Sequence, residues 1–231
     1  MRFYYIRHGE PIYNPNQLTP LGHLQARSVA KRLARVDFRE IHSSTSQRAI
    51  ETAQPLCELL KKEMILQDWC NESYAFNALS VAGTEKRVWG FNDSKTRKIW
   101  MEPELLALGL EWYKHPAFRG TSFETGFLEI IRASDAYLEG LGYARDEQRR
   151  CYRAVRPNND NIALFAHGGM GGVILSHILG VPYPQFVLHS EMSHTGVTVI
   201  DFKEKDGFVI PWVHTYSNDS HLYFDDLPLN Y

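Results

Sequence analysis

FYYIRHG (residues 3–9) joins an apolar, aromatic-rich run to a charged turn. Met1 to Ile6 predicts a buried first β-strand, because aromatic and aliphatic residues are enriched in strands. Arg7, His8 and Gly9 follow it directly, which places this turn at the carboxyl end of the predicted strand. Open α/β sheets bind their ligands at the carboxyl ends of their strands, so we expect His8 to line a binding site.

A second histidine has the same setting much later in the chain. NIALFA (161–166) predicts another buried strand, and His167, Gly168 and Gly169 come directly after it. Two strand ends of one sheet lie close together, so we expect the two histidines to share one pocket. The glycines that follow each histidine would allow the backbone to approach a ligand closely.

A polar segment between these two motifs adds an arginine. SSTSQRA (43–49) follows a predicted strand at 36–42 and begins a predicted helix. Arg48 would lie in the first turn of that helix, whose amino terminus favours anions. Arg7 and Arg48 are fork-shaped donors, and together with two imidazoles they favour a tetrahedral phosphate over a neutral ligand.

The remaining pattern alternates strands with helices and predicts a three-layer α/β sandwich, with a mostly parallel sheet and helices on both faces. Further predicted elements are a helix begun by Thr19 and Pro20, a helix through Ile50 to Leu60, and a strand at 64–69. They continue with a long helix from Thr121 or Ser122 to near Gly142, a helix at 173–179, and strands at 197–202 and 208–213. Ser44 with Gln47 indicates a capping box, and Pro55 predicts a kink or break. Asp206 and Gly207 indicate a hairpin that adds antiparallel strands to the sheet.

The regular alternation fails over about 75–120, which predicts an insertion or cap over the strand ends within a single domain of residues 1–231. Its tryptophans and basic residues, from 87 to 112, are expected to serve cap packing and a solvated face rather than substrate recognition. The segment 145–161 is polar and is expected to be a solvated connection. We expect structural roles for the other histidines, which include His23, His42, His115, His177, His189 and His214.

Composition limits the class of protein. The formal net charge of −2 argues against a general nucleic-acid surface. No apolar run approaches the roughly 20 residues of a membrane span, and Met1 leads straight into a strand without room for a signal peptide. We therefore expect a cytoplasmic protein with no nucleic-acid or membrane partner. Cys57, Cys70 and Cys151 lack CxxC spacing and are expected to be reduced thiols.

Four motifs occur in a specific order along the chain. They are RHGEPIYN (7–14), LTPLGHLQA (18–26), SSTSQRAIETA (43–53) and AHGG (166–169). In this order they resemble the histidine phosphatase superfamily, branch 1, whose members are phosphoglycerate mutase-like. The resemblance implies a phosphoglycerate mutase-like fold and a phosphatase that hydrolyses phosphate monoesters without a metal or another cofactor.

The resemblance also implies roles for individual residues. His8 would form a phosphohistidine, which suits a neutral imidazole near pH 7. Arg7, Arg48 and His167 would contact the phosphoryl oxygens, with Asn14 as a further donor. The backbone at Gly168 would approach the phosphate. The short turn at Ser193, His194 and Thr195 resembles a family turn near the phosphate, whereas Asn218, Asp219 and His221 resemble a carboxyl-terminal signature that we interpret as structural.

The leaving oxygen needs a proton, and in the resembling family a carboxylate after the third strand supplies it. Asp68 and Glu72 both lie in the segment QDWCNESYAF (67–76). We favour Glu72, because Asp68 is still close to the predicted strand. Aromatic residues at Trp69, Tyr74 and Phe76 are expected to form a lid that raises the pKa of the acid.

Two other functions stay open. A cofactor-dependent phosphoglycerate mutase usually has a longer stretch between the RHG motif and the next helix, whereas only residues 15–17 separate Asn14 from Leu18. A non-catalytic protein that binds a phosphorylated ligand would not need to retain both histidines and both arginines. The sequence therefore favours hydrolysis of a small phosphorylated substrate, with a phosphoprotein less favoured.

Overall fold

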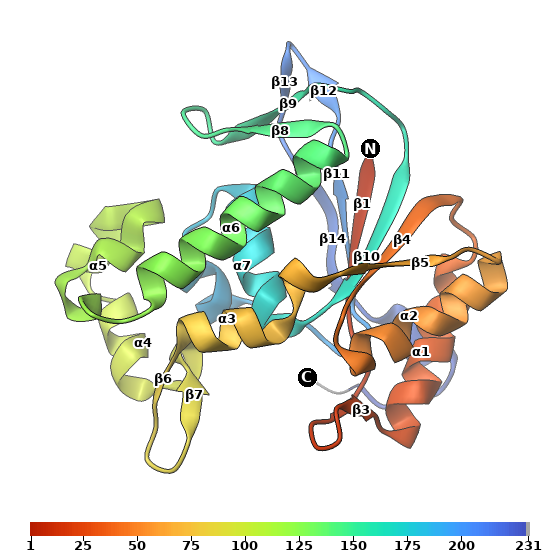
Figure 1. The fold of residues 1–231 in the computed structure, drawn as a ribbon, viewed down its shortest axis with the longest axis horizontal. Helices are drawn as coiled ribbons and strands as arrows, with labels where there is room; N and C mark the ends of the chain where they lie inside the picture. Colours follow the sequence, from red (N-terminus) through yellow and green to blue (C-terminus); the bar gives the residue numbers. More distant parts are fainter. Residues whose placement is uncertain (230–231) are drawn as a thin grey trace.

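A six-stranded sheet forms the centre of the protein in a computed structural model, of which we describe residues 1–229. The strands are ordered β14 (Trp212–Asn218), β11 (Val197–Asp201), β1 (Arg2–Arg7), β10 (Asn161–Ala166), β4 (Phe38–Ser44) and β5 (Met64–Gln67). The last four are parallel, whereas β11 and β14 are antiparallel to their neighbours. This arrangement confirms the predicted mostly parallel α/β sheet (Figure 1).

The pairing of β1 with β10 decides where the two histidines lie. Arg7 is the register partner of Ala166, so His8 and His167 leave the same edge of the sheet side by side. The His8 backbone N–H donates to the Ala166 carbonyl at 2.9 Å, which continues the pairing one residue beyond the strand.

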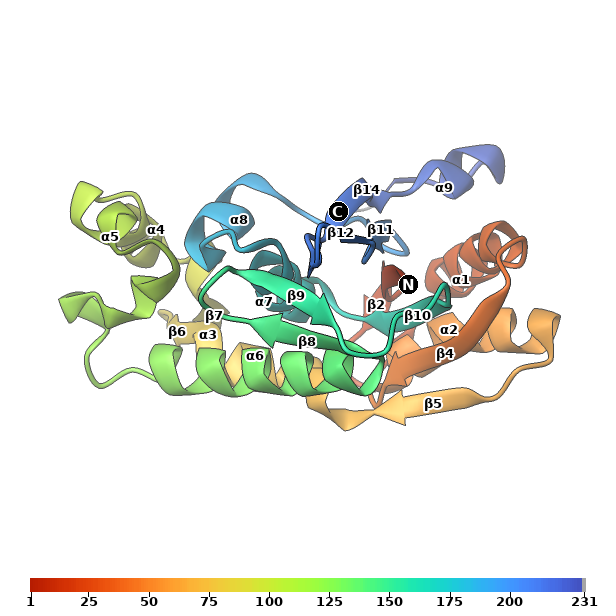
Figure 2. The same ribbon diagram turned by 90° about the horizontal axis from the view of Figure 1, so that it is seen from above.

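Helices cover both faces of the sheet (Figure 2). Successive side chains of a strand point to opposite faces, and along β1 Tyr4 and Ile6 pack in one buried cluster whereas Phe3 and Tyr5 pack in the other. The Tyr4 cluster includes residues of α1 (Pro20–Leu33) and α2 (Gln47–Leu60). The Tyr5 cluster includes residues of α6 (Phe123–Gly140) and α7 (Gly168–Leu179). The predicted three-layer order is therefore confirmed.

The starts of α1 and α2 differ in how well the sequence predicted them. The Thr19 hydroxyl accepts from the Gly22 backbone N–H at 2.9 Å, as its N-cap position predicted. The prediction of a capping box at Ser44 was wrong. Helix α2 begins after Ser46, and the Ser44 hydroxyl contacts His167 instead. The expected break at Pro55 is also absent, since α2 runs through it while packed against α1 and β4.

The segment 75–120, which we call the cap, contains short elements only. They are the end of α3 (Glu72–Leu79), β6 (Ser80–Ala82), β7 (Arg87–Trp89), η2 (Gly90–Asn92), α4 (Ser94–Trp100), α5 (Pro103–Leu108), η3 (Gly109–Lys114) and η4 (Pro116–Phe118). Figure 1 shows α4 and α5 at the left, beyond the amino end of α6. Trp100 and Trp112 are fully buried there, in the cluster that also contains Tyr5. This shared core supports our proposal of one domain with an insertion.

The segment 145–161, expected to be a solvated connection, contains regular structure. It contributes to a hairpin of β8 (Tyr143–Asp146) and β9 (Cys151–Ala154), which joins β13 (Phe208–Val209) and β12 (Glu204–Lys205) in a separate sheet. Tyr143 and Tyr152 are buried within it against Phe202. The turn at Asp206 and Gly207 has positive φ angles of 54° and 83°, as a tight hairpin requires, but it joins β12 to β13 and not two strands of the central sheet.

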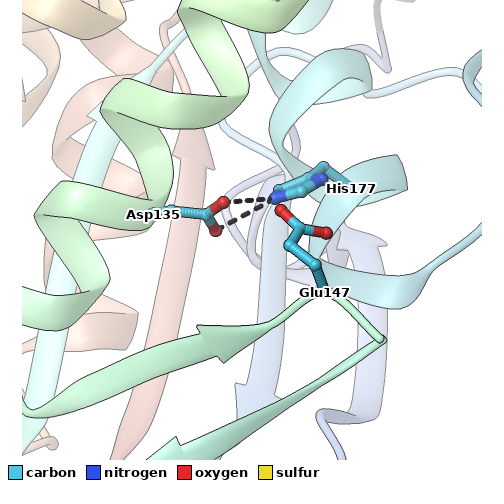
Figure 3. A group of neighbouring side chains, drawn as sticks. All are labelled: Asp135, Glu147 and His177. Carbon is cyan, nitrogen blue, oxygen red and sulfur yellow. Dashed lines mark hydrogen bonds and ion pairs between the residues drawn. The ribbon is translucent and has the colours of Figure 1, made fainter. Parts of the chain in front are cut away.

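A histidine and two carboxylates meet where α6, α7 and the β8–β9 connection come together (Figure 3). His177 Nε2 lies 2.9 Å from both carboxylate oxygens of Asp135, and one atom each of Asp135, Glu147 and His177 lie within 4.8 Å of one another. The guanidinium of Arg145 lies 3.8 Å from Glu147 and adds a positive charge there. We interpret the group as a tie between α6 and α7, as expected for His177.

Among residues 1–229, no helix combines the length and the hydrophobicity that crossing a bilayer requires.

Candidate active site

His8 and His167 meet at the carboxyl edge of β1 and β10. Their ring centroids are 5.2 Å apart, and the side chains are 3% and 0% exposed. His8 Nδ1 lies 2.7 Å from the carbonyl oxygen of Gly9, and only a protonated nitrogen can donate to a carbonyl. The lone pair of the neutral ring is therefore on Nε2.

Both imidazoles are neutral. Burial lowers the pKa of His8 well below its usual value, and the nearby positive groups of His167 and Arg48 lower it further. Burial, with Arg48 and Arg7, does the same to the pKa of His167. A neutral imidazole keeps the lone pair that nucleophilic attack requires.

Arg48 reaches the two histidines from the first turn of α2. Its Nη2 donates to His167 Nδ1 at 3.1 Å and its Nη1 to Asn16 Oδ1 at 2.9 Å. Its Nε is buried without a hydrogen-bond partner among the described residues. Since His167 Nδ1 accepts, its proton is on Nε2, which donates to the Ser44 hydroxyl at 2.8 Å.

Arg7 is held by the turn that precedes β11. Its guanidinium donates to the Met192 carbonyl and, at 3.0 Å, to His194 Nε2. Burial lowers the pKa of His194 to about 3, so the ring is a neutral acceptor. Arg7 Nε is buried without a partner in the described part of the chain.

The two guanidiniums form an uncompensated positive site. Burial lowers the pKa of Arg7 and of Arg48, and neither has a salt bridge to a carboxylate within residues 1–229. Buried charges in proteins are normally paired, and planar donor forks match the oxygens of a phosphate. This electrostatic arrangement suits a dianion.

Glu72, the first residue of α3, is the carboxylate at this site. Its Oε2 lies 3.4 Å from His167 Nδ1, and its Oε1 accepts from the Met170 backbone N–H at 3.3 Å. Asp68 lies outside, because it is exposed and accepts from Thr45 and Tyr74 at 2.8 and 2.7 Å. Those two hydrogen bonds lower the pKa of Asp68. The geometry therefore favours Glu72 as the acid.

The aromatic lid differs from the expected one. Trp69 and Tyr74 line a separate hollow between α3 and α6. Phe76 does line the site, in edge contact with Trp89 at 5.2 Å between ring centroids. Trp89 comes from the cap, where the sequence suggested packing alone.

The glycines after His167 leave room for these groups. A Cβ on Gly168 would lie 3.3 Å from Arg7 Nε. A Cβ on Gly169 would lie 2.4 Å from both Glu72 Oε1 and the tip of the Trp89 ring. The start of α7 therefore tolerates no side chain at 169 without moving Glu72 or Trp89.

The loop after His8 requires one correction. Asn14 is exposed and is not among the described residues that line the site. Asn16 lies there instead, with its amide between Arg48 and the Ser46 hydroxyl, to which Asn16 Nδ2 donates at 3.0 Å. The sequence contained no signal that separates these two amides, because both lie in the same polar loop.

A cavity of about 980 Å³ is lined by several of these residues, whereas His167 and His194 are not among its described lining residues. Its inner end is formed by Arg7, His8, Arg48 and Glu72. Tyr13 covers Arg48, whose guanidinium carbon lies 5.4 Å from the ring centroid. The outer wall of the cavity contains basic and aromatic side chains of the cap.

Known proteins are similar to this chain in sequence and in structure. A putative phosphoserine phosphatase 2 of Hydrogenobacter thermophilus is 22% identical over 209 residues, which is 86% of this chain and 88% of that protein. A phosphoserine phosphatase from Entamoeba histolytica has a TM-score of 0.62 at 20% identity, over 96% of this chain and 98% of that one. A mycobacterial glucosyl-3-phosphoglycerate phosphatase has a TM-score of 0.61 at 18% identity, over 94% and 98%.

A match to a protein-family model adds sequence evidence to this structural similarity. The model of the histidine phosphatase superfamily, branch 1, matches residues 3–76. This segment contains the RHG turn, Arg48 and Glu72. His167 lies outside the match, but β10 brings it next to His8 in a fold that this chain shares with solved phosphatases. Residues 3–76 of this chain are therefore similar to the histidine phosphatase superfamily, branch 1.

Proposed function

We propose that this protein is a metal-independent phosphatase that hydrolyses small phosphate monoesters through a phosphohistidine on His8. The observation that carries the proposal is the tautomer of His8. Its Nδ1 proton is engaged by the Gly9 carbonyl at 2.7 Å, so the lone pair is on Nε2. Arg48 and Arg7 lie near enough to lower the pKa of His8, and neither has a salt bridge to a carboxylate among residues 1–229.

In the first step, Arg7 and Arg48 bind the phosphoryl oxygens, and His167 orients Arg48 by accepting from its Nη2 at 3.1 Å. His8 Nε2 attacks phosphorus, the P–O bond to the leaving group breaks, and the leaving oxygen takes the proton of Glu72. A bound dianion next to Glu72 favours its protonated form. Glu72 Oε2 also lies 3.4 Å from His167 Nδ1, which carries a lone pair. A proton on Glu72 makes this contact more favourable, because an ionised carboxylate would face that lone pair with a negative charge.

In the second step, water attacks phosphorus and the P–N bond breaks. Glu72, now ionised, accepts the proton of the water, and phosphate leaves. His8 Nε2 recovers its lone pair and Glu72 its proton, so both residues return to their starting states.

The charges of the site support independence from metal ions. Phosphoryl transfer needs positive charge near the equatorial oxygens of the transition state. Arg7 and Arg48 supply two fixed positive charges that lie within a buried site and require no reorganisation.

The relatives support a small substrate. One solved phosphoserine phosphatase is described in complex with phosphoserine and another structure with 3-phosphoglyceric acid. We propose a phosphorylated metabolite of this general kind, and not a phosphoprotein, as the substrate class. We also propose the cytoplasm as the location, where the free thiols of Cys57, Cys70 and Cys151 would persist.

The direct test is hydrolysis of p-nitrophenyl phosphate and of a panel of phosphorylated metabolites by purified protein in EDTA. We expect turnover by the wild type, loss of turnover in His8→Ala, and normal turnover in His23→Ala, which alters an exposed histidine of α1. Loss of activity in EDTA that magnesium restores would contradict the metal-independent mechanism. Phosphate transfer only with added bisphosphoglycerate would indicate a mutase, and ligand binding without turnover would indicate a binding protein.

A further inference from the structure

The outer part of the cavity contains a second group of positive charges. Lys86, Arg87 and Arg97 come from the cap, are exposed, and line the same cavity as His8. Among the described lining residues, only Glu72 and Glu191 carry carboxylates. Because Arg7 and Arg48 would be engaged by the reacting phosphate, the three cap cations remain available for another part of the substrate.

Two of these side chains differ in how they are held. Arg87 is fixed by Ser80, to whose hydroxyl and carbonyl it donates at 2.8 and 2.7 Å. The guanidinium of Arg97, on α4, has no hydrogen bond or ion pair with any of residues 1–229, and only the Arg97 backbone N–H donates, to the Asp93 carbonyl at 2.9 Å. The charge of Arg97 is therefore free to meet a ligand without breaking an existing contact.

Aromatic side chains line the same cavity as the two charged regions. Trp89 and Phe91 are stacked, with 5.2 Å between centroids and 15° between planes, and Phe76 meets Trp89 edge-on. Phe186, on α8 (Tyr183–His189), also lines the cavity. The volume of about 980 Å³ is at the upper end of the roughly 300–1,000 Å³ of ordinary ligand pockets. The leaving group is therefore expected to have a substantial apolar body.

We propose that the substrate is a phosphate monoester whose leaving group combines a planar or apolar body with a second anionic group. The body packs on Trp89 and Phe91, and the second anion, a carboxylate or a phosphate, binds Arg97 with Arg87. This inference rests on the proposed function, since it assumes that the first phosphate occupies the site of Arg7 and Arg48.

The test compares three substrates: naphthyl phosphate, a carboxynaphthyl phosphate and a naphthalene bisphosphate. We expect the wild type to prefer the two doubly charged substrates in kcat/KM. Arg97→Gln should reduce that preference about tenfold, the scale of one charge-assisted hydrogen bond, mainly through KM, while naphthyl phosphate is hydrolysed as before. Arg132→Gln is the matched control, because Arg132 is exposed on α6 and does not line the cavity.

An Arg97→Gln variant with the wild-type preference would overturn the proposal, as would a wild type that does not prefer the charged substrates. The better doubly charged substrate identifies the anion as carboxylate or phosphate. Failure of the proposed function looks different, because then no substrate is turned over or turnover survives in His8→Ala. In that case, calorimetric binding of naphthylmethyl phosphonate and its carboxylated analogue to wild type and Arg97→Gln still decides whether Arg97 recognises the second anion.

Discussion

Hydrogen bonds to the three imidazoles of the site fix where each lone pair lies. A guanidinium has no lone pair, so a histidine nitrogen that faces one must accept. His167 Nδ1 therefore accepts from Arg48 and His194 Nε2 accepts from Arg7, whereas His8 Nδ1 donates to Gly9. The sequence predicted Arg7, His8, Arg48 and His167 together, because each lies at a strand end or helix start. It did not predict His194 as the acceptor of Arg7, since that contact depends on a turn 187 residues away.

Glu72→Gln tests the leaving-group acid. Because a good leaving group needs no proton, the substitution should slow alkyl phosphates far more than p-nitrophenyl phosphate. The selective loss should be about 10²- to 10⁴-fold, the usual contribution of general acid catalysis. Kinetics with both substrates measure it, and Asp68→Asn is the matched control that should behave like the wild type. A selective loss in Asp68→Asn, with normal Glu72→Gln, would identify Asp68 as the acid.

Asn16→Ala tests the correction in the first loop. It removes the acceptor that holds Arg48 Nη1 at 2.9 Å, so Arg48 should be oriented less precisely towards phosphate. We expect kcat/KM for p-nitrophenyl phosphate to fall about tenfold, the scale of a hydrogen bond to a charged group. Asn14→Ala should have wild-type kinetics. A tenfold loss in Asn14→Ala, with wild-type kinetics in Asn16→Ala, would show that Asn14 and not Asn16 supports phosphate binding.

At the scale of elements, the two strands that end at the site could be predicted because their sequence signals are local. Buried runs before the RHG and AHGG motifs each indicated a strand, and β1 and β10 lie there. The turn expected after His167 was wrong, because α7 begins directly at Gly168. Elements of the cap could not be predicted, because its short helices and hairpin are stabilised by long-range aromatic packing. Trp112, for example, contacts Phe123, Phe127 and Tyr183.

Gly169→Ala tests the close approach of α7 to the acid. The added Cβ would lie 2.4 Å from Glu72 Oε1 and from Trp89, so Glu72 must move. We expect turnover of alkyl phosphates to fall more than that of p-nitrophenyl phosphate. Gly140→Ala, in α6 with nothing within 4 Å of the added Cβ, should leave both rates unchanged. Equal kinetics for the two variants would show that α7 does not constrain the acid.

At the scale of the whole molecule, the fold joins site residues that lie far apart in the chain, from Arg7 to His194. Its carboxyl-terminal part contacts the site through Thr195. His221 Nε2 lies 2.9 Å from the Thr195 hydroxyl, and the Thr195 backbone N–H donates to the His8 carbonyl at 3.2 Å. The sequence suggested a structural role for His221, and these contacts agree with that role. The partner of His221 could not be predicted, since nothing in the sequence relates α9 (Ser220–Phe224) to the turn at Thr195.

Acid should destabilise the protein through such buried histidines. Burial, with Arg32, lowers the pKa of His221 from 6.5 to about 4. Below pH 6.5 the unfolded chain binds the proton that the folded chain excludes, so the free energy of unfolding falls as the pH drops from 6.5 towards 4. His221 should account for about 3 kcal/mol of that loss.

Urea unfolding at a series of pH values measures this slope. His221→Asn should be less sensitive to acid than the wild type between pH 6.5 and 4. His189→Asn, which alters an exposed histidine at the end of α8, should keep the wild-type slope. Identical slopes for the wild type and His221→Asn would exclude His221 as a source of the acid sensitivity.

Trapping the phosphoenzyme tests the central claim most directly. The protein is mixed briefly with a radiolabelled phosphate monoester, quenched in alkali, in which phosphohistidine survives, and digested for peptide mapping. We predict label on the peptide that contains His8, lost on acid treatment and absent from His8→Asn. Label on a serine, or label and full activity in His8→Asn, would contradict a phosphohistidine mechanism.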